Sequence, residues 1–455
     1  MGLLDTLLDS VRRCCEALPD RRTGANRRYT MAEISLAAFS VFFTQSPSFL
    51  AHQRHLETGQ GRSNGQTLFG LENIPTDNHI RAMLDPVLPD HLFPVFADTM
   101  TALERTGGLE TFRRLGSLGS HVLIALDGTE YHRSAKVRCS HCSTRTRAGQ
   151  PTEYFHSLLC ATLVAPGHAQ AVPLAPEFIV PQDGHDKQDC ESRAVRRWLE
   201  RHGAAHARLN PIYLGDDLYA CQPVCEAVLA AGGHFLFVCK PSSHQTIREY
   251  LTRIDLDEHV ERVKRGRERS THRYRWLLDV PLRGDEEALV VNWLQIEILN
   301  AVGEVTYRTS FITDLPVTRD TVAELSACGR ARWKVENESF NVLKTKGYHL
   351  EHTFGHGKQH LAAVLASLNL LAFALHAVCD LAEGLWRQAR ETLGPRTRFF
   401  QGLQVLTSYL VFSSWSDLLE TLAFARPPPS GAPATARPNR LATATQSDQT
   451  RTNPK

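Results

Sequence analysis

HVLIALDGT, residues 121–129, is an apolar run of β-forming side chains that ends in an acid and a turn signal. A short run of this kind predicts a buried strand, which we expect to end at Asp127. Similar runs at 154–164 and 171–180 predict two further strands. Three strands in succession predict a sheet around which the remaining chain is organised.

The chain then alternates between helical and strand patterns. Residues 186–202 are predicted as a helix, with Asp183 as a cap near its start. Residues 211–215 are predicted as a strand, followed by a helix to about Ala231 and another strand at 234–240. This order predicts an α/β fold in which helices cover a mixed sheet.

Residues 254–320 follow a different pattern, which predicts a β-rich insertion. Three stretches, 274–282, 288–299 and 305–313, are rich in Val, Ile, Trp and Tyr. The insertion begins with a basic stretch that consists of Arg262, Lys264, Arg265, Arg267, Arg269, Arg273 and Arg275. This stretch is either the solvated face of a hairpin or a ridge that follows DNA phosphates.

The two ends of the chain differ from this core. Residues 1–115 are predicted to form a helical domain, with a helix at 31–43 and a capped helix start at Thr76. Either this domain packs as ordinary helices or it grips DNA ends. We divide the rest into 116–253 as the first part of the core, 254–320 as the insertion, 321–425 as C-terminal helices, and 426–455 as a Pro- and Ala-rich tail that is expected to be disordered.

Bulk composition excludes some classes of protein. The chain has 455 residues and a net charge of only +2, so any contact with nucleic acid must come from local patches. Its 11 cysteines are scattered without a compact framework, which favours a reducing compartment. No secretory signal is evident. The apolar stretch 361–381 contains polar residues and is predicted to be a buried helix, with no association with a membrane.

Three acids are candidates for a metal centre. Asp127 and Asp216 each follow an apolar β-type run, and Glu336 lies in a helical stretch. Asp217 is an alternative to Asp216, and Glu338 is an alternative to Glu336. Carboxylates that converge in this way bind hard divalent cations, and paired cations promote phosphoryl transfer. Taken singly, the same residues are also typical of turns, helix caps and surface ion pairs.

Two longer motifs accompany these acids: PQDGHDKQDCE at 181–191 and RWKVENESFNVLKTKGYHLEH at 332–352. Together with the acids, they resemble the insertion-sequence DDE transposases whose last acid lies in a Tyr/Arg/Glu/Lys helix. The resemblance runs from about Asp127 to about Gly357. It implies an RNase H-like core with Asp127, Asp216 and Glu336 as the catalytic and metal-binding triad.

The resemblance also has two departures. The family's tyrosine is missing before Arg332, and Lys344 lies one residue farther from Glu336 than the family pattern places it. Arg332 and Lys344 match basic positions of the family's helix. We therefore expect DNA contacts from these two residues together with Lys346, Arg265 and Arg267.

The function implied by the resemblance is a DDE transposase. Such an enzyme cleaves transposon-end DNA and joins the 3′ hydroxyl to target DNA, with two Mg²⁺ ions for which Mn²⁺ can substitute. The implied partners are terminal inverted repeats, target DNA and a second copy of the chain in the DNA complex; the expected location is the bacterial cytoplasm, on the nucleoid when DNA is bound. Alternatives are an RNase H-like nuclease without strand transfer and a domesticated DNA-binding protein with an inactive core.

A separate pattern, Cys139-Ser140-His141-Cys142, has the spacing of half a zinc site. His141, His156 and Cys160 are nearby candidates for the remaining ligands. Zinc binding is one interpretation, and unpaired reduced cysteines are the other.

Overall fold

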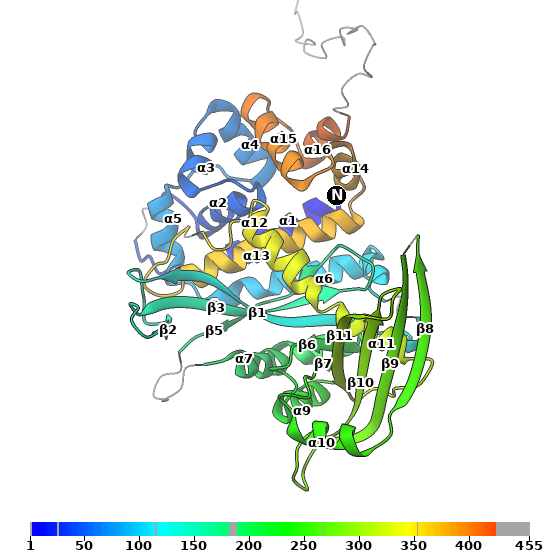
Figure 1. Cartoon of the computed structure of the whole chain (residues 1–455). Helices are drawn as coiled ribbons and strands as arrows, with labels where there is room; N and C mark the ends of the chain where they lie inside the picture. The colour runs from blue at the N-terminus through cyan, green and yellow to red at the C-terminus, as the bar shows by residue number, and fades with distance from the viewer. Residues whose placement is uncertain are drawn as a thin grey trace, which may run out of the picture.

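The computed structural model describes residues 2–24, 27–113, 116–181, 189–266, 268–352 and 354–424. Its centre is a mixed sheet of eleven strands, most of which follow the order β2-β3-β1-β6-β7-β11-β10-β9-β8, while β4 and β5 pair with β3. The N- and C-terminal helices lie on one side of this sheet, and α7 and α9 lie on the other (Figure 1). The predicted α/β class with a mixed sheet is confirmed at this level.

The strands of the sheet are β1 (Val122–Ser134), β2 (Ser143–Arg145), β3 (Glu153–Val164), β4 (Val172–Pro173), β5 (Glu177–Ile179), β6 (Pro211–Gly215), β7 (His234–Val238), β8 (Asp257–Arg265), β9 (Glu268–Pro281), β10 (Val290–Leu299) and β11 (Val305–Thr313). β1 is antiparallel to β3 and parallel to β6, and β6 is parallel to β7. β5 is antiparallel to β3.

The helices are α1 (Leu3–Glu16), α2 (Met31–Phe43), α3 (Phe49–Leu56), α4 (Gly59–Phe69), α5 (Asp77–Leu84), α6 (Phe93–Arg105), α7 (Glu191–Trp198), α8 (Ala204–Ala207), α9 (Gln222–Ala230), α10 (Gln245–Arg253), α11 (Val322–Arg330), α12 (Asn341–Thr345), α13 (Leu361–Ala382), α14 (Gly384–Leu393), α15 (Arg396–Tyr409) and α16 (Trp415–Ala423). Short 3₁₀ segments are η1 (Pro89–Leu92), η2 (Gly108–Thr111) and η3 (Gly116–Leu118), and π-helical segments are η4 (Leu199–Gly203) and η5 (Val335–Phe340).

The end predicted for the first strand was wrong. β1 does not stop at Asp127 but continues to Ser134, and the Cα partner of Asp127 across the antiparallel pair is Cys160. β1 extends because β3 is long enough to keep satisfying its backbone hydrogen bonds past the Asp-Gly pair. The predicted strand 171–180 is also divided, into β4 and β5.

Two predicted helices have different bounds in the structure. The helix expected from 186 begins at Glu191, because Asp189 and Cys190 are not helical. The predicted cap Asp183 lies outside the described residues. The helical stretch expected to carry Glu336 is divided into α11, η5 and α12.

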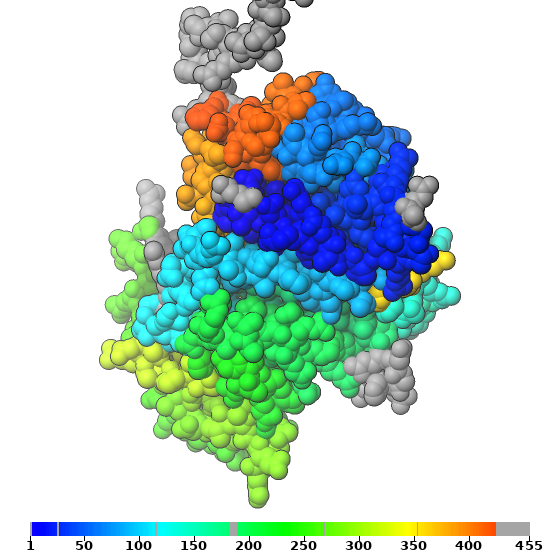
Figure 2. Space-filling view, turned by 180° about the vertical axis from the view of Figure 1, so that it is seen from behind, coloured from blue at the N-terminus to red at the C-terminus, as the bar shows by residue number. Residues whose placement is uncertain are grey.

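The helices from the two ends of the chain share one core. Figure 2 shows the N-terminal helices lying against the C-terminal ones. The Glu383 carboxylate accepts a hydrogen bond of 2.9 Å from the Leu3 N–H at the start of α1, and the Asn64 amide donates to the Thr407 carbonyl at 2.9 Å. The predicted N-terminal helices are present, and they form one layer with α13–α16.

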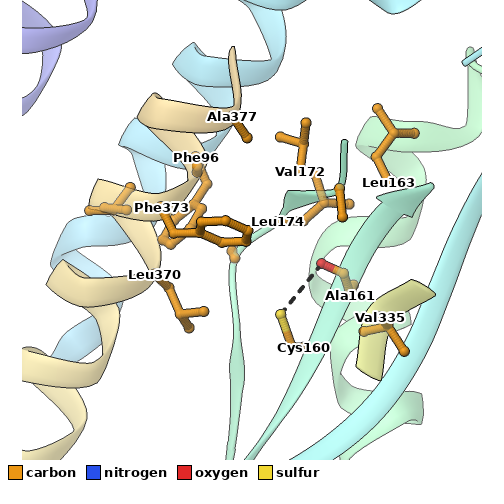
Figure 3. Close-up of a cluster of buried hydrophobic side chains, with 14 of the residues drawn as sticks. Phe96, Cys160, Ala161, Leu163, Val172, Leu174, Val335, Leu370, Phe373 and Ala377 are labelled. Atoms are coloured by element: carbon orange, nitrogen blue, oxygen red, sulfur yellow. Dashed lines mark hydrogen bonds between the residues drawn. The ribbon is translucent and has the colours of Figure 1, made fainter. Parts of the chain in front are cut away.

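One helix, α13, is long and apolar enough to cross a membrane, with a mean hydropathy of 2.1 over its most apolar window. That window is 89% buried inside the protein. Figure 3 shows Leu370, Phe373 and Ala377 of α13 facing an apolar cluster that includes Ala161 and Leu163. α13 is therefore the buried core helix that its polar residues predict.

The β-rich insertion is present and continues the central sheet. β11 pairs antiparallel with β7 through Phe311, Ile312 and Thr313, and β10, β9 and β8 follow outward. The tail 426–455 lies outside the described residues.

Candidate functional site

Asp127 is a largely buried acid that lies among other charged groups. Its side chain is only 20% exposed, and its Oδ2 lies 3.7 Å from a guanidinium nitrogen of Arg332. Burial raises the pKa of Asp127 to about 6; Arg332 opposes this rise, and the charges of Glu191 and Asp216 add to it. A buried carboxylate that is surrounded by other acids favours a bound cation, because a cation removes the repulsion between them.

Asp216 follows β6, the parallel neighbour of β1, and this pairing brings it within electrostatic range of Asp127. Its Oδ1 accepts a hydrogen bond of 2.9 Å from the Leu218 N–H. The adjacent Asp217 has different neighbours: it accepts a 2.6 Å hydrogen bond from the Lys240 N–H and lies 3.4 Å from His244. The structure thus brings Asp216 together with Asp127, whereas Asp217 accepts a backbone hydrogen bond from the turn after β7.

A further acid, Glu191, lies beside these two. It is the first residue of α7 and packs against Gly128, where an added Cβ would lie only 2.4 Å from the Glu191 carboxyl carbon. The Tyr219 hydroxyl donates a hydrogen bond of 3.0 Å to Glu191. Burial and the Asp216 charge raise the pKa of Glu191, while the bond from Tyr219 lowers it.

Glu191 was not predicted to be a site residue, although two features of the sequence could have indicated it. Gly128 directly follows Asp127, where only a residue without a side chain leaves room for Glu191. Tyr219 follows Asp216 by three residues and reaches Glu191 with its hydroxyl.

Arg332 precedes η5, and Glu336 lies within η5, one helical turn after Arg332. η5 packs against β1 and β3, which places this segment beside Asp127. The side chain of Glu336 is exposed and that of Glu338 is half-buried. Within the described ranges, the Glu336 side chain makes no hydrogen bond or ion pair, while its backbone carbonyl accepts from the Asn341 N–H. The structure therefore brings Asp127, Asp216, Glu191 and Arg332 together and leaves Glu336 open to solvent on the adjoining helix.

The expected DNA-binding residues have varied surroundings. Lys344 forms an ion pair of 2.8 Å with Glu351, while Lys346 is exposed. Arg265 belongs to β8, but its side chain, like the whole of Arg267, lies outside what the structure describes.

The basic stretch of the insertion is partly neutralised by acids on neighbouring strands. Arg275 lies 3.0 Å from Glu258, and Arg273 lies 3.3 Å from Glu297. These contacts favour a paired strand face over a free phosphate ridge at these two positions.

A second cluster contains thiols and imidazoles. Cys139 and Cys142 lie in the loop between β1 and β2, His156 belongs to β3, and His356 precedes α13. Their ligand atoms all lie within 4.8 Å of one another, and the group could hold a metal ion. The predicted pair Cys139 and Cys142 belongs to this cluster, as does the candidate His156.

Two other candidates for this cluster are outside it, and one member was not predicted. His141 lies against His360, with ring centroids 5.0 Å apart. Cys160 is buried in the apolar cluster of Figure 3, where burial raises its thiol pKa to about 12. His356 was missed because it lies 200 positions from His156 in the sequence, and no local pattern marks it as a ligand.

No protein-family model matches this chain, and no curated protein is similar enough to count as a relative.

Proposed function

We propose that this protein is a DDE transposase that cleaves transposon-end DNA and transfers the freed 3′ end to target DNA. The observation that carries the proposal is the convergence of Asp127 and Asp216, from adjacent parallel strands, with Arg332 beside them. These residues are distant in sequence and match the positions that the resemblance assigns to catalysis.

The strand arrangement supports an RNase H-like core. β5, β3 and β1 are antiparallel neighbours, and β6 and β7 continue from β1 as parallel strands. This arrangement aligns the segment after β6 with the middle of β1, where Asp127 lies. Several α/β folds share parts of this order, so the acids carry more weight than the topology.

Each residue has a role in the proposed reaction. Asp127 and Asp216 would hold the cations, and Glu336, on the adjoining helix, would be their third carboxylate. Arg332 matches phosphate with its planar fork. Cations held there would activate a water and neutralise charge at the phosphodiester. The protein itself positions the carboxylates and Arg332 around the phosphodiester that reacts.

The two clusters fit different ions. We assign Mg²⁺, with Mn²⁺ as a substitute, to the carboxylates, because hard oxygen ligands suit these ions. Burial is the main cause of the raised pKa of Asp127, and the repulsion from Glu191 and Asp216 that adds to it is consistent with a site built for positive charge. Zn²⁺ is assigned to the thiol–imidazole cluster, because soft thiolates and imidazole select it.

The test is a cleavage and strand-transfer assay with DNA that carries the flanks of the protein's own coding sequence. We expect Mg²⁺-dependent nicking at the ends and joining of a pre-cleaved 3′ end to a target plasmid. Asp216→Asn should abolish both steps, and Asp217→Asn, the matched control, should retain them.

Other results identify other functions. Cleavage without joining would identify a nuclease, and DNA binding without cleavage would identify an inactive core. Equal activity of the Asp216→Asn and Asp217→Asn variants would refute the assignment of the second acid. A DNA complex that contains two copies of the chain would support the expected dimer.

A further inference from the structure

The thiol–imidazole cluster has the dimensions of a tetrahedral zinc site. With Zn–S near 2.3 Å and Zn–N near 2.0 Å, tetrahedral geometry separates ligand atoms by about 3.8 Å for S–S, about 3.5 Å for S–N and about 3.3 Å for N–N. The structure has 3.9 Å between the sulfurs of Cys139 and Cys142, and 3.1 Å between the Nε2 atoms of His156 and His356. Three of the four S–N separations are 3.5 Å, from Cys139 to His156, and 3.4 Å, from Cys142 to each histidine; the fourth, from Cys139 to His356, is within 4.8 Å.

A disulfide does not explain this geometry. Bonded sulfurs lie about 2.05 Å apart, far less than the separation of Cys139 and Cys142. Both cysteines are free. Mutual hydrogen bonding does not explain it either, because thiols are weak donors and two imidazole nitrogens at 3.1 Å can share only one proton.

The groups around the cluster orient its histidines. His356 Nδ1 donates a hydrogen bond of 2.9 Å to the Gly357 carbonyl, which leaves Nε2 with its lone pair toward the cluster. The ring of His156 stacks on Tyr131, with centroids 5.6 Å apart and an interplanar angle of 15°. Asp85 accepts hydrogen bonds from the Lys358 and Gln359 N–H groups at 3.0 Å, which fixes the chain just after His356.

We propose that Cys139, Cys142, His156 and His356 form a closed, structural Zn²⁺ site that fastens the segment after the Arg332–Glu336 region to the β1–β3 side of the sheet. Four protein ligands leave no open position for a substrate, which is the mark of a structural site. Three of the four ligands are buried. The inference stands on this geometry alone and does not rest on the proposed transposase activity.

The site has a consequence for the segment that carries Arg332 and Glu336. Cys142 and His356 are separated by 214 positions, and most strands of the sheet lie between them in the sequence. A shared ion therefore joins two distant parts of the chain. The segment from η5 to His356 is held at its start by packing on β1 and β3 and at its end by the ion. Loss of zinc should therefore destabilise the fold and loosen this segment.

The experiment measures zinc directly on the full-length protein. We expect about one Zn²⁺ per chain by mass spectrometry after purification without chelator. Replacement by Co²⁺ should give the visible d–d bands of a tetrahedral ion and a thiolate charge-transfer band. His356→Ala should weaken Zn²⁺ binding by at least about tenfold. His360→Ala, a neighbouring histidine outside the cluster, should bind zinc like the wild type.

Three results would overturn the proposal: wild-type protein that neither contains Zn²⁺ nor takes it up, Co²⁺ binding without a thiolate band, or unchanged zinc affinity in His356→Ala. If His356→Ala fails to fold, the wild-type zinc content and Co²⁺ spectrum still decide, and Cys139→Ser serves as the second variant because Cys139 is only partly buried. Failure of DNA cleavage would leave these results unaffected, so the two proposals can fail separately.

Discussion

Replacing Asp127 by Asn should abolish cleavage and, at the same time, stabilise the metal-free protein. The pKa of Asp127 rises from an ordinary 3.8 to about 6 because the carboxylate is buried and faces Glu191 and Asp216. At about 1.4 kcal/mol for each pH unit, this difference corresponds to about 3 kcal/mol of lost stability when Asp127 is charged. Asn has nearly the same shape and no charge, so it should recover most of that free energy.

The stability gained in Asp127→Asn should depend on pH. A carboxyl group whose folded pKa is raised destabilises the fold above that pKa and has no effect below its unfolded pKa. The gain in Asp127→Asn should therefore be full above about pH 6 and should vanish near pH 4. Denaturant unfolding in EDTA at pH 8 and pH 4 measures it.

Magnesium provides the second readout for the same variant. Mg²⁺ should stabilise the wild type at pH 8, because a ligand that binds only the folded state raises its stability. Asp127→Asn should lose that gain and should cleave DNA about a thousandfold more slowly, equivalent to about 4 kcal/mol. An Asn variant that is less stable than the wild type at pH 8 would show that Asp127 is a structural partner of Arg332 and would refute the reasoning. Asp217→Asn is the control, which should not be stabilised.

Three other changes test separate parts of the structure. Glu336→Gln should abolish cleavage and Glu338→Gln should not; activity that survives in Glu336→Gln and disappears in Glu191→Gln would move the third position to Glu191. Arg332→Ala should lower the cleavage rate about a hundredfold through loss of a phosphate contact. It should also raise the pKa of Asp127 further, so that, as the pH is lowered, cleavage by Arg332→Ala declines at a higher pH than cleavage by the wild type. An unchanged pH profile would contradict this. Burial lowers the pKa of His52 to about 3. The contribution of His52 to the free energy of unfolding should therefore be full above about pH 6.5 and should fall by about 1.4 kcal/mol for each pH unit below it. In urea unfolding between pH 7 and pH 5, the free energy of unfolding of His52→Gln should change less with pH than that of the wild type; an equal change would exclude His52 as a cause.

The sequence predicted the elements of this fold better than their ends. Runs such as 211–215 and 305–313 coincide with β6 and β11, and 31–43 coincides with α2, because local hydrophobic periodicity determines them. Strand ends depend on the partner instead. β1 passes through the Asp-Gly pair because β3 lies beside it, and that partnership has no local signal.

The sites show the same division between local and distant information. Cys139 and Cys142 were found from their spacing, whereas His356 joins them only through the tertiary fold. Asp127 and Asp216 were singled out because each follows an apolar, β-type run of the sequence. Glu191 was missed because its place in the cluster depends on the absence of a side chain at Gly128. Local sequence patterns identify poorly those residues that come together only after folding.

The shared core of the terminal helices has a consequence for biosynthesis. α2 is buried along nearly its whole length and packs on α13. More than 300 residues separate the two helices, so at roughly 5–20 residues per second the ribosome takes about 15–60 s to deliver the second after the first. During that interval α2 has its early partners α1 and α5 but not α13, so the nascent chain exposes apolar surface that can associate with other chains.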